Sequence, residues 1–408
     1  MRWAAPSCWP RASGWPVSSP GGPTPGRRWT TAPRHCPCPR LLAAPQPVHP
    51  VALPALPPSL NRIAERVEAR LDVLLLGETE RWANLDPSLE PPMSAMRRLV
   101  LSGGKRLRPA FCHWGFVGSG GDPEDPAVVD AGAALELLHT FALIHDDVMD
   151  GSPLRRGNES VHCSFEKRHA TEGWRGEGRR FGEGAAILVG DLAFVYADLL
   201  LGDVPRAAWD VFTELRLEVN VGQYLDLVGT AQGGTMPGQA GVDQARRIGQ
   251  YKSGKYTIER PLHLGAALAG RLDDMEGPLS AYGAPLGEAF QLRDDLLGVF
   301  GDTAVTGKPV GEDLREGRPT ALYAYAAGSA DGPAAKLLAD RFGVSDLTEA
   351  EVADLQKVFE ETGARRKVEV AVDRLVTEAL AAIEDAPVLS EARAELIELA
   401  NYVADRDH

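Results

Sequence analysis

Two groups of aspartates, far apart in the chain, have the residue types and spacing for metal chemistry. Asp146, Asp147 and Asp150 occur in LIHDDVMD, and Asp294 and Asp295 occur in FQLRDDLLG. Residues four apart share one face of an α-helix, so Asp146 and Asp150 should point the same way, with Asp147 turned by about 100°. Carboxylates grouped at the end of an apolar helix are costly to desolvate unless cations neutralise them. An all-oxygen ligand set favours Mg²⁺.

Two other interpretations of the aspartates stay open at this point. A DDxxD pattern can be a solvated helix end, and paired carboxylates can catalyse glycoside hydrolysis. The apolar run before the first cluster argues against a solvated end. The cations elsewhere in the chain argue against hydrolysis, because they would keep the carboxylates ionised and because they suit phosphate.

Basic residues accompany both groups of aspartates. In SGGKRLRP, Lys105, Arg106 and Arg108 follow directly after Gly103 and Gly104. Glycine lets the backbone approach an anion closely, and arginine binds phosphate through a bidentate fork. The GxxxxGK[ST] spacing of a nucleotide-binding loop is absent. The set continues with Arg155, Arg156, Lys252, Lys255, Lys308 and Arg318. Together with the aspartates, these cations predict a site for two polyanions and Mg²⁺.

The motifs resemble those of the trans-isoprenyl diphosphate synthases, and of the short-chain branch that makes geranylgeranyl diphosphate. They occur in the order SGGKRLRP, LIHDDVMD, SPLRRG, VGD, GQYLDL and FQLRDD, and the resemblance spans about residues 60 to 405. It implies an all-α, isoprenoid-synthase-like bundle of antiparallel helices around a central cavity. It also implies Mg²⁺-dependent head-to-tail condensation of isopentenyl diphosphate with an allylic diphosphate, which would be dimethylallyl, geranyl or farnesyl diphosphate.

The resemblance also implies roles for individual residues. The metal ligands, and with them the catalytic set, would be Asp146, Asp147, Asp150, Asp294 and Asp295. The isopentenyl diphosphate site would comprise Gly104, Lys105, Arg108, His139 and Arg156. The allylic diphosphate site would comprise Arg155, Lys252, Gln291 and Lys308. Product length would be set one turn before the first cluster, by Phe141, Ala142 and Leu138. An aromatic residue there, with no insertion in DDVMD, goes with geranylgeranyl diphosphate.

Some positions depart from the family pattern. Gly298 stands where many members have a third aspartate, and Asp302 or water would replace it. The lysine motif reads KSGKYT, and we favour Lys252 over Lys255 because Ser253 mimics the usual threonine.

Three competing functions follow from these motifs. Farnesyl diphosphate synthase is the alternative product class. A class I terpene cyclase would leave the second diphosphate site unexplained. A non-catalytic subunit of a heteromeric synthase should have damaged metal motifs, whereas the first motif is intact.

The chain has an ordinary globular composition with a distinct first segment. It has 408 residues, of which 44% are hydrophobic, and a net charge of −14, which opposes a broad nucleic-acid surface. Residues 1–58 hold 15 of the 31 prolines and no acidic residue, so we expect a disordered tail, or a mis-assigned start, before a synthase domain over 59–408.

Cysteine content and hydropathy bound the cell compartment. Five cysteines in 408 residues are too few for a disulfide framework. The sequence contains no unbroken apolar run of about 18 residues, so no membrane-spanning helix is predicted. We therefore expect a cytoplasmic protein, and the resemblance implies a homodimer.

The hydrophobic pattern is helical almost without interruption from Leu60 onward. The first helix places Ile63, Val67, Leu71 and Leu74 on one face. Further helices are predicted over 127–150, 185–201, 206–229, 242–270, 278–300, 318–328, 333–342, 348–361, 364–384 and 389–404. Glycine-rich loops are predicted over 171–184 and 230–238, and no strand alternation is evident.

Overall fold

The computed structural model describes residues 57–232, 236–301 and 310–404. The predictions for the tail before residue 57, for Asp302 and for Lys308 therefore lie outside the described residues. The chain divides into two units, Met1–Pro50 and Val51–His408, and every element below belongs to the second.

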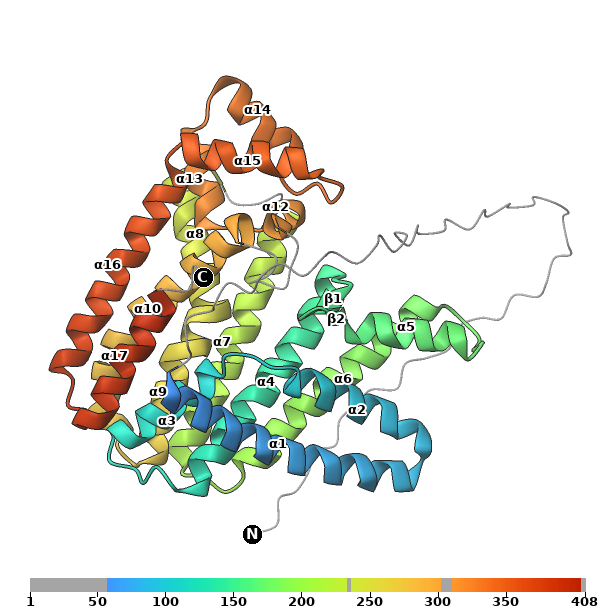
Figure 1. Ribbon diagram of the computed structural model, residues 1–408, viewed down its shortest axis with the longest axis vertical. Coiled ribbons are helices and arrows are strands. Elements are labelled where there is room, and N and C mark those ends of the chain that lie inside the picture. Colours follow the sequence, from blue (N-terminus) through green and yellow to red (C-terminus); the bar gives the residue numbers. More distant parts are fainter. Residues whose placement is uncertain (1–56, 233–235, 302–309, 405–408) are drawn as a thin grey trace, which may run out of the picture. The chain divides into compact units, whose positions relative to one another are not determined.

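Helices make up nearly all of the described structure, so the all-α prediction is confirmed (Figure 1). In chain order they are α1 (Pro58–Leu85), η1 (Pro87–Leu89), α2 (Glu90–Leu101), α3 (Leu107–Gly118), α4 (Pro126–Asp150), α5 (Val161–Thr171), α6 (Gly178–Leu201), α7 (Arg206–Ala231), α8 (Gln239–Gly249), η2 (Gln250–Glu259), α9 (Arg260–Leu268), α10 (Leu272–Phe300), α12 (Glu312–Glu316), α13 (Ala321–Ser329), α14 (Gly332–Arg341), α15 (Glu349–Glu361), α16 (Ala364–Asp385) and α17 (Ser390–Ala404).

Helix α4 carries the first aspartate cluster through the middle of the bundle. It begins where the Asp125 side chain accepts a hydrogen bond from the Ala127 amide at 2.9 Å, with Pro126 at the first helical position. It ends at Gly151, whose φ of 66° is left-handed. Residues from Ala131 to Leu138 are buried all round, as the sequence predicted, because α4 packs against α1, α3 and α6. The second cluster lies on α10, which packs along α16 (Figure 1).

The region between residues 151 and 184 differs from the prediction. Leu154–Arg155 (β1) and Asn158–Glu159 (β2) form a short antiparallel hairpin, which the alternation test missed because each strand has two residues. The predicted loop over 171–184 is correct only in part, since α6 already begins at Gly178. A Cβ atom at Gly182 would collide with the carbonyl oxygen of His162 in α5. Glycine therefore serves close helix packing there, and not flexibility.

Four described α-helices, α2, α3, α5 and α12, were not predicted, and the helix predicted over 242–270 is not uniform. Its centre, η2, is a π-helix. Glycines on both sides allow this wider segment to fit: a Cβ atom at Gly254 would lie 3.0 Å from the Gly287 backbone of α10, and one at Gly222 in α7 would collide with Lys252. Such π-helical segments often occur at functional sites, and η2 carries both candidate lysines.

Two described helices, α4 and α6, are long and apolar enough to cross a membrane by length and composition alone. Their most apolar windows have mean hydropathies of 1.6 and 1.8, and 61% and 44% of these windows are buried inside the bundle. The sequence prediction of no membrane span required an unbroken apolar run, whereas the mean hydropathy of a window can be high even when the window contains one or two charged residues. Because core helices of globular proteins pass the same test, the result is weak support for a span.

Candidate active site

A cavity of about 740 Å³ lies among α4, α7, η2 and α10. Its lining brings together residues that are up to 218 positions apart in the chain, from Ser102 to Thr320, including residues of both aspartate clusters. The predicted site residues that line it are Gly104, Lys105, Arg108, His139, Ala142, Asp146, Arg155, Arg156, Lys252, Gln291, Asp294 and Asp295. Asp147, Asp150, Phe141 and Leu138 do not line it. Leu138 is fully buried within α4.

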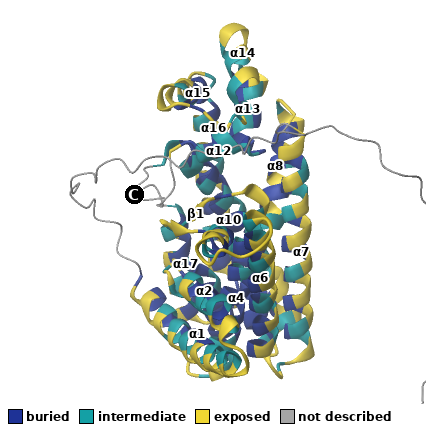
Figure 2. Cartoon of the chain, turned by 90° about the vertical axis from the view of Figure 1, so that its right-hand side faces the viewer, coloured by how far each residue is buried: buried dark blue, intermediate teal, exposed yellow. Residues whose placement is uncertain are grey.

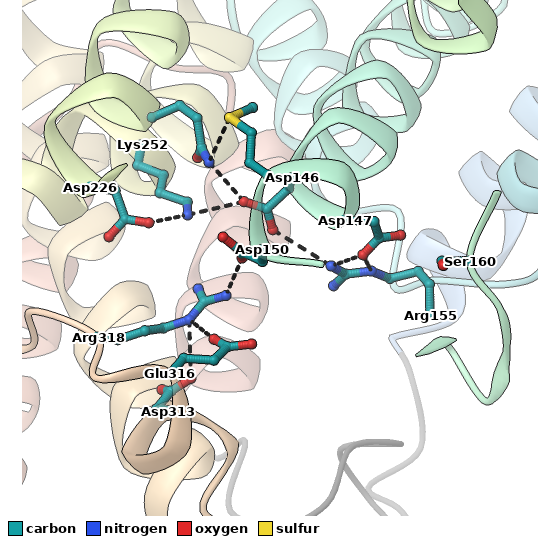
Figure 3. A network of polar contacts seen from close by, with 12 residues as sticks. Asp146, Asp147, Asp150, Arg155, Ser160, Asp226, Lys252, Asp313, Glu316 and Arg318 are labelled. Carbon is teal, nitrogen blue, oxygen red and sulfur yellow. Dashed lines mark hydrogen bonds and ion pairs between the residues drawn. The ribbon is translucent and has the colours of Figure 1, made fainter. Parts of the chain in front are cut away.

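Asp146 is the centre of a network of ion pairs at the first cluster (Figure 3). Its Oδ1 atom accepts hydrogen bonds from Gln223 Nε2 at 2.9 Å and from Lys252 Nζ at 3.3 Å. Lys252 also pairs with Asp226 at 2.6 Å. Burial opposes ionisation of Asp146, but Lys252, Arg318 and Arg155 together outweigh it and lower the pKa to about 2. Asp146 is therefore ionised in the absence of metal.

The other two aspartates of this cluster are held by arginines. Asp147 accepts a hydrogen bond from Arg155 Nε at 2.8 Å, and its Oδ2 atom is buried without a hydrogen-bond partner. Asp150 pairs with Arg318 at 3.0 Å. Burial raises the pKa of Asp147, and burial together with the Asp146 charge raises that of Asp150 to about 6. A further cation would therefore be well accommodated by this wall of the cavity.

The second cluster has different surroundings. Asp295 is buried and accepts a hydrogen bond from Gln291 Nε2 at 2.7 Å. Burial, with the nearby carboxylates of Asp313 and Asp294, raises the pKa of Asp295 to about 8. Asp313 belongs to α12, which also brings Glu312 to the cavity.

Gly298 marks the place of the absent third aspartate, and Asp313 fills it. A Cβ atom at Gly298 would collide with the Asp313 carboxylate. Sequence reasoning offered Asp302 or water here and missed Asp313, which is fifteen residues further along in GEDLRE. The glycine and the carboxylate can be matched only once α12 is folded against α10.

The glycine-rich loop and the hairpin hold each other through backbone geometry. Gly103 and Gly104 have φ values of 96° and 136°, and Arg156 is left-handed at 52°. Arg156 Nη1 donates a hydrogen bond to the Gly103 carbonyl, and a Cβ atom at Gly104 would lie 3.0 Å from Arg156 Nη2. Glycine is thus required at 104 by both conformation and space.

Arg106 has a structural role within the cationic loop. Its side chain is buried and pairs with Glu136 and with Glu68, the latter at 2.8 Å. It also donates to the Val100 carbonyl at 2.6 Å. These contacts pin the loop to α1 and α4, although Arg106, like Lys105 and Arg108, is among the residues that line the cavity.

His139 lies beside two residues that sequence reasoning missed. Its Nδ1 atom is 2.8 Å from the hydroxyl of Tyr256, and Arg108 lies over the Tyr256 ring at 4.1 Å. Arg108 Nη2 also donates to Thr257 Oγ1 at 3.0 Å. Burial, reinforced by Arg108 and Arg156, holds the pKa of His139 well below its usual value. A neutral imidazole therefore faces this end of the cavity.

The two candidate lysines of η2 separate clearly. Lys252 lines the cavity and bridges Asp146 and Asp226. Lys255 pairs with Glu218 at 2.5 Å, outside the cavity lining. Glu218 is also held by Arg260 at 2.7 Å. This arrangement supports Lys252 as the diphosphate ligand and gives Lys255 a structural role.

The donors of the cavity suit Mg²⁺ shared with phosphate. Among the described residues, no three His, Cys, Asp or Glu side chains already converge on one metal position. Mg²⁺ commonly keeps several waters and takes only one or two carboxylates together with phosphate oxygens. The raised pKa of Asp295 marks a place in the lining where a cation would stabilise a carboxylate, whereas the unpartnered Asp147 oxygen is buried outside the lining.

Comparisons with known proteins agree with this geometry. The family model described as polyprenyl synthetase matches residues 91–362. A short chain isoprenyl diphosphate synthase of Methanothermobacter thermautotrophicus is 32% identical over 79% of this chain and 93% of its own length. In Mycobacterium tuberculosis, a geranylgeranyl diphosphate synthase is 32% identical over 81% of this chain and 86% of its own length, and a (2E,6E)-farnesyl diphosphate synthase is 29% identical over 79% and 87%.

The structural comparison points the same way. Geranylgeranyl pyrophosphate synthase of Corynebacterium glutamicum, solved with isoprenyl diphosphate and magnesium, superposes with a TM-score of 0.80 at 36% identity, over 85% of this chain and 99% of that one. The chain belongs to the polyprenyl synthetase family, as its motifs indicated, and is a prenyltransferase of the isoprenyl diphosphate synthase type.

Proposed function

We propose that the enzyme makes geranylgeranyl diphosphate by Mg²⁺-dependent head-to-tail condensation of isopentenyl diphosphate with dimethylallyl, geranyl or farnesyl diphosphate. The observation that carries this proposal is one cavity with aspartate clusters on two walls and the SGGKRLRP loop between them, which provides for two diphosphates. The choice of product is supported by small Ala142 in the lining, by the Phe141 ring beside it, and by relatives named geranylgeranyl diphosphate synthases.

The cations of the first wall would exchange partners when substrate binds. Without substrate, the side chains of Lys252, Arg155 and Arg318 pair with aspartates. The negatively charged phosphate oxygens of an allylic diphosphate would replace the carboxylates as their hydrogen-bond acceptors. Asp146, Asp147, Asp150, Asp294 and Asp295 would hold Mg²⁺, which supplies charge neutralisation to the leaving diphosphate. The cations of the chain add to this effect, because the developing negative charge lies next to them.

The other residues position the second substrate and exclude water. Lys105, Arg108 and Arg156 would bind isopentenyl diphosphate with its double bond toward the allylic carbon. Apolar residues of the lining keep water from the cation; they include Leu143, Val219, Ile248 and Phe290. Burial holds the pKa of His139 well below its usual value, so its imidazole is a weak proton acceptor, and burial raises the pKa of Tyr256, so its phenol stays protonated; neither is poised as a base. The released diphosphate is the proton acceptor in this scheme.

One assay separates this function from its competitors. Labelled isopentenyl diphosphate is incubated with each allylic primer and Mg²⁺, and the products are sized after dephosphorylation. We expect geranylgeraniol. Farnesol as the sole product would identify a farnesyl diphosphate synthase, which other relatives favour by name. Cyclised hydrocarbon would identify a cyclase, and the absence of product with every primer would support the non-catalytic subunit.

We also propose that the enzyme is a homodimer through α6 and α7. Large apolar side chains project from these helices with much of their surface exposed: Leu188 (64%), Val195 (60%) and Leu199 (58%) on α6, and Leu217 (58%) and Tyr224 (67%) on α7. The outer side of α7 is visibly exposed (Figure 2). Apolar patches of this kind mark association surfaces. Sedimentation should give a dimer, and Leu188→Glu with Tyr224→Glu should give a monomer.

We propose that residues 59–408 form the complete synthase unit. Helix α1 begins at Pro58, and its buried residues Leu60, Ile63 and Val67 belong to the core. A protein that starts at residue 57 should therefore keep its thermal unfolding transition and its turnover. Loss of either would show that the preceding residues contribute to the fold or to the site.

A further inference from the structure

Beside Ala142, a residue of the cavity lining, two helices contribute a pair of aromatic rings that do not themselves line the cavity. Ala142 of α4 and Val219 of α7 line the cavity there. The neighbouring Phe141 is turned toward α6, where its ring meets that of Phe194 edge to face, with centroids 4.9 Å apart. The Phe141 ring also contacts His145 at 4.6 Å. We expect an isoprenoid tail that grows past Ala142 to reach this pair of rings.

Arg216 holds the Phe194 ring from the side of α7. It lies one turn before Val219, and its guanidinium is 5.1 Å from the centroid of Phe194. The same group lies 4.8 Å from the Phe212 ring and 5.9 Å from the Trp209 ring. A guanidinium attracts the face of an aromatic ring through a cation–π interaction, and its planar shape allows it to stack on the ring. Arg216 therefore restricts the orientation of the rings that it covers.

The position of Arg216 is itself well determined. Its Nη1 atom pairs with Asp198 Oδ1 of α6 at 2.6 Å, and its Nη2 atom donates to Thr213 Oγ1 at 3.3 Å. The side chain is 14% exposed. Arg216 thus reaches from α7 to α6 and is anchored to both helices.

We propose that Arg216 is a positioning residue for product length: it fixes Phe194, so that Phe141 and Phe194 together form a rigid end wall that stops elongation. The proposal rests on the synthase function given above and deepens it. Phe141 alone could turn away from a growing tail, because its other ring neighbour, His145, is a single side chain on the same helix. With Phe194 clamped, the space behind Phe141 stays filled and the tail cannot advance.

The test compares product lengths of four variants under identical substrate ratios. Phe194→Ala removes the ring, and Arg216→Met keeps length and packing but removes the charge. Arg216→Lys restores a cation near the rings. Arg168→Met is the matched control, since Arg168 lies over the exposed Trp174 ring at 5.6 Å and lines no part of the cavity.

Phe194→Ala and Arg216→Met should both lengthen the main product by roughly one isoprene unit, because the room opened is that of a ring. Arg216→Lys should return most of the product to the parent length, and Arg168→Met should leave the distribution unchanged. The KM for isopentenyl diphosphate and the rate of the first condensation should stay within about twofold of the parent, because the wall acts only on the grown tail.

The double variant Phe194→Ala/Arg216→Met supplies the decisive comparison. If Arg216 acts through Phe194, the double variant gives the same distribution as Phe194→Ala alone. A parent distribution from Arg216→Met, or further lengthening in the double variant, would overturn the proposal. If the unsubstituted enzyme is active and the variants give its product distribution, only this proposal is contradicted. If the unsubstituted enzyme is inactive with every primer, the synthase function is contradicted as well.

Discussion

Both aspartate clusters contribute to the lining of one cavity, the first through Asp146 alone, and the two clusters differ in their electrostatic surroundings. The first is surrounded by cations from three other elements: Arg155 from the hairpin, Lys252 from η2 and Arg318 near α12. The second faces the acidic helix α12, and Asp295 hydrogen-bonds to the neutral amide of Gln291. The cations around the first cluster keep Asp146 ionised without metal, with its pKa at about 2, whereas the pKa of Asp150 is raised to about 6.

This difference means that the two clusters have different protonation states before metal binds. The pKa of Asp295, raised to about 8 by burial and by its carboxylate neighbours, keeps a proton on the second wall until a cation arrives. The first wall offers both charges that a Mg²⁺–diphosphate needs, carboxylates and cations. On the second wall Arg318 pairs with Asp313 at 3.5 Å, but burial and the neighbouring carboxylates outweigh its effect on Asp295, so Asp295 should become a ligand when metal displaces the proton.

Removal of Asp146 should have the largest effect, because it joins the carboxylates to the cations of the first wall. We expect Asp146→Ala to lose on the order of 10³ in turnover, as when a major electrostatic stabiliser is removed. Steady-state assays with saturating Mg²⁺ would measure it. Asp130→Ala is the control on the same helix, since Asp130 pairs with Arg70 outside the cavity. Near-normal turnover of Asp146→Ala would show that the first wall is not the activating one.

The lysines of η2 should separate binding from stability. Lys252→Met should raise the KM for the allylic primer by roughly 10- to 100-fold, the value of a charged hydrogen bond. Lys255→Met should instead lower the free energy of unfolding by about 1–3 kcal/mol, since it leaves buried Glu218 with one cation fewer. Kinetics and thermal unfolding of both variants would measure this. The reverse result would reassign the diphosphate lysine.

Gly298→Ala should perturb the second wall through Asp313. The added methyl group would displace the Asp313 carboxylate, and such overpacking costs about 1–3 kcal/mol. We expect the Mg²⁺ concentration for half-maximal binding of a diphosphate analogue, measured by calorimetry, to rise by about tenfold if the carboxylate loses its place. Gly277→Ala is the control, because Gly277 lies on α10 with nothing within 4 Å of an added Cβ. Equal results for the two variants would remove Asp313 from the site.

The smallest expected effect is a dependence of metal-free stability on pH. Because Asp295 holds its proton in the folded state up to about pH 8 and releases it near 3.8 when unfolded, the folded state binds more protons between these values. Stability should therefore fall as the pH rises from about 4 to 8, and Asp295→Asn should reduce that slope. Chemical denaturation in the presence of a chelator would measure both. An unchanged slope in the variant would show that the second wall carries no such proton.

The amino-acid sequence alone determined the helical class and many of the charged residues that line the cavity. The continuous apolar surface of 127–145 predicted a central helix, because no exposed helix tolerates it. The helical period placed Asp146 and Asp150 on related faces, and the motifs identified twelve of the residues that line the cavity. These properties depend on residues that are close together in the sequence, so they can be assigned without knowing the tertiary contacts.

Only the tertiary structure decided which charges neutralise which. Arg106 and Arg108 look equivalent in the motif, but Glu136 and Glu68 bind Arg106, whereas Arg108 donates to Thr257 and lies over the Tyr256 ring. Likewise, Gly298 became intelligible once Asp313 was seen beside it. Ion pairs and steric fits form between residues brought together by helix packing, so no spacing along the chain records them. The helical period could locate Phe141, but the packing of α6 decided that its ring meets Phe194.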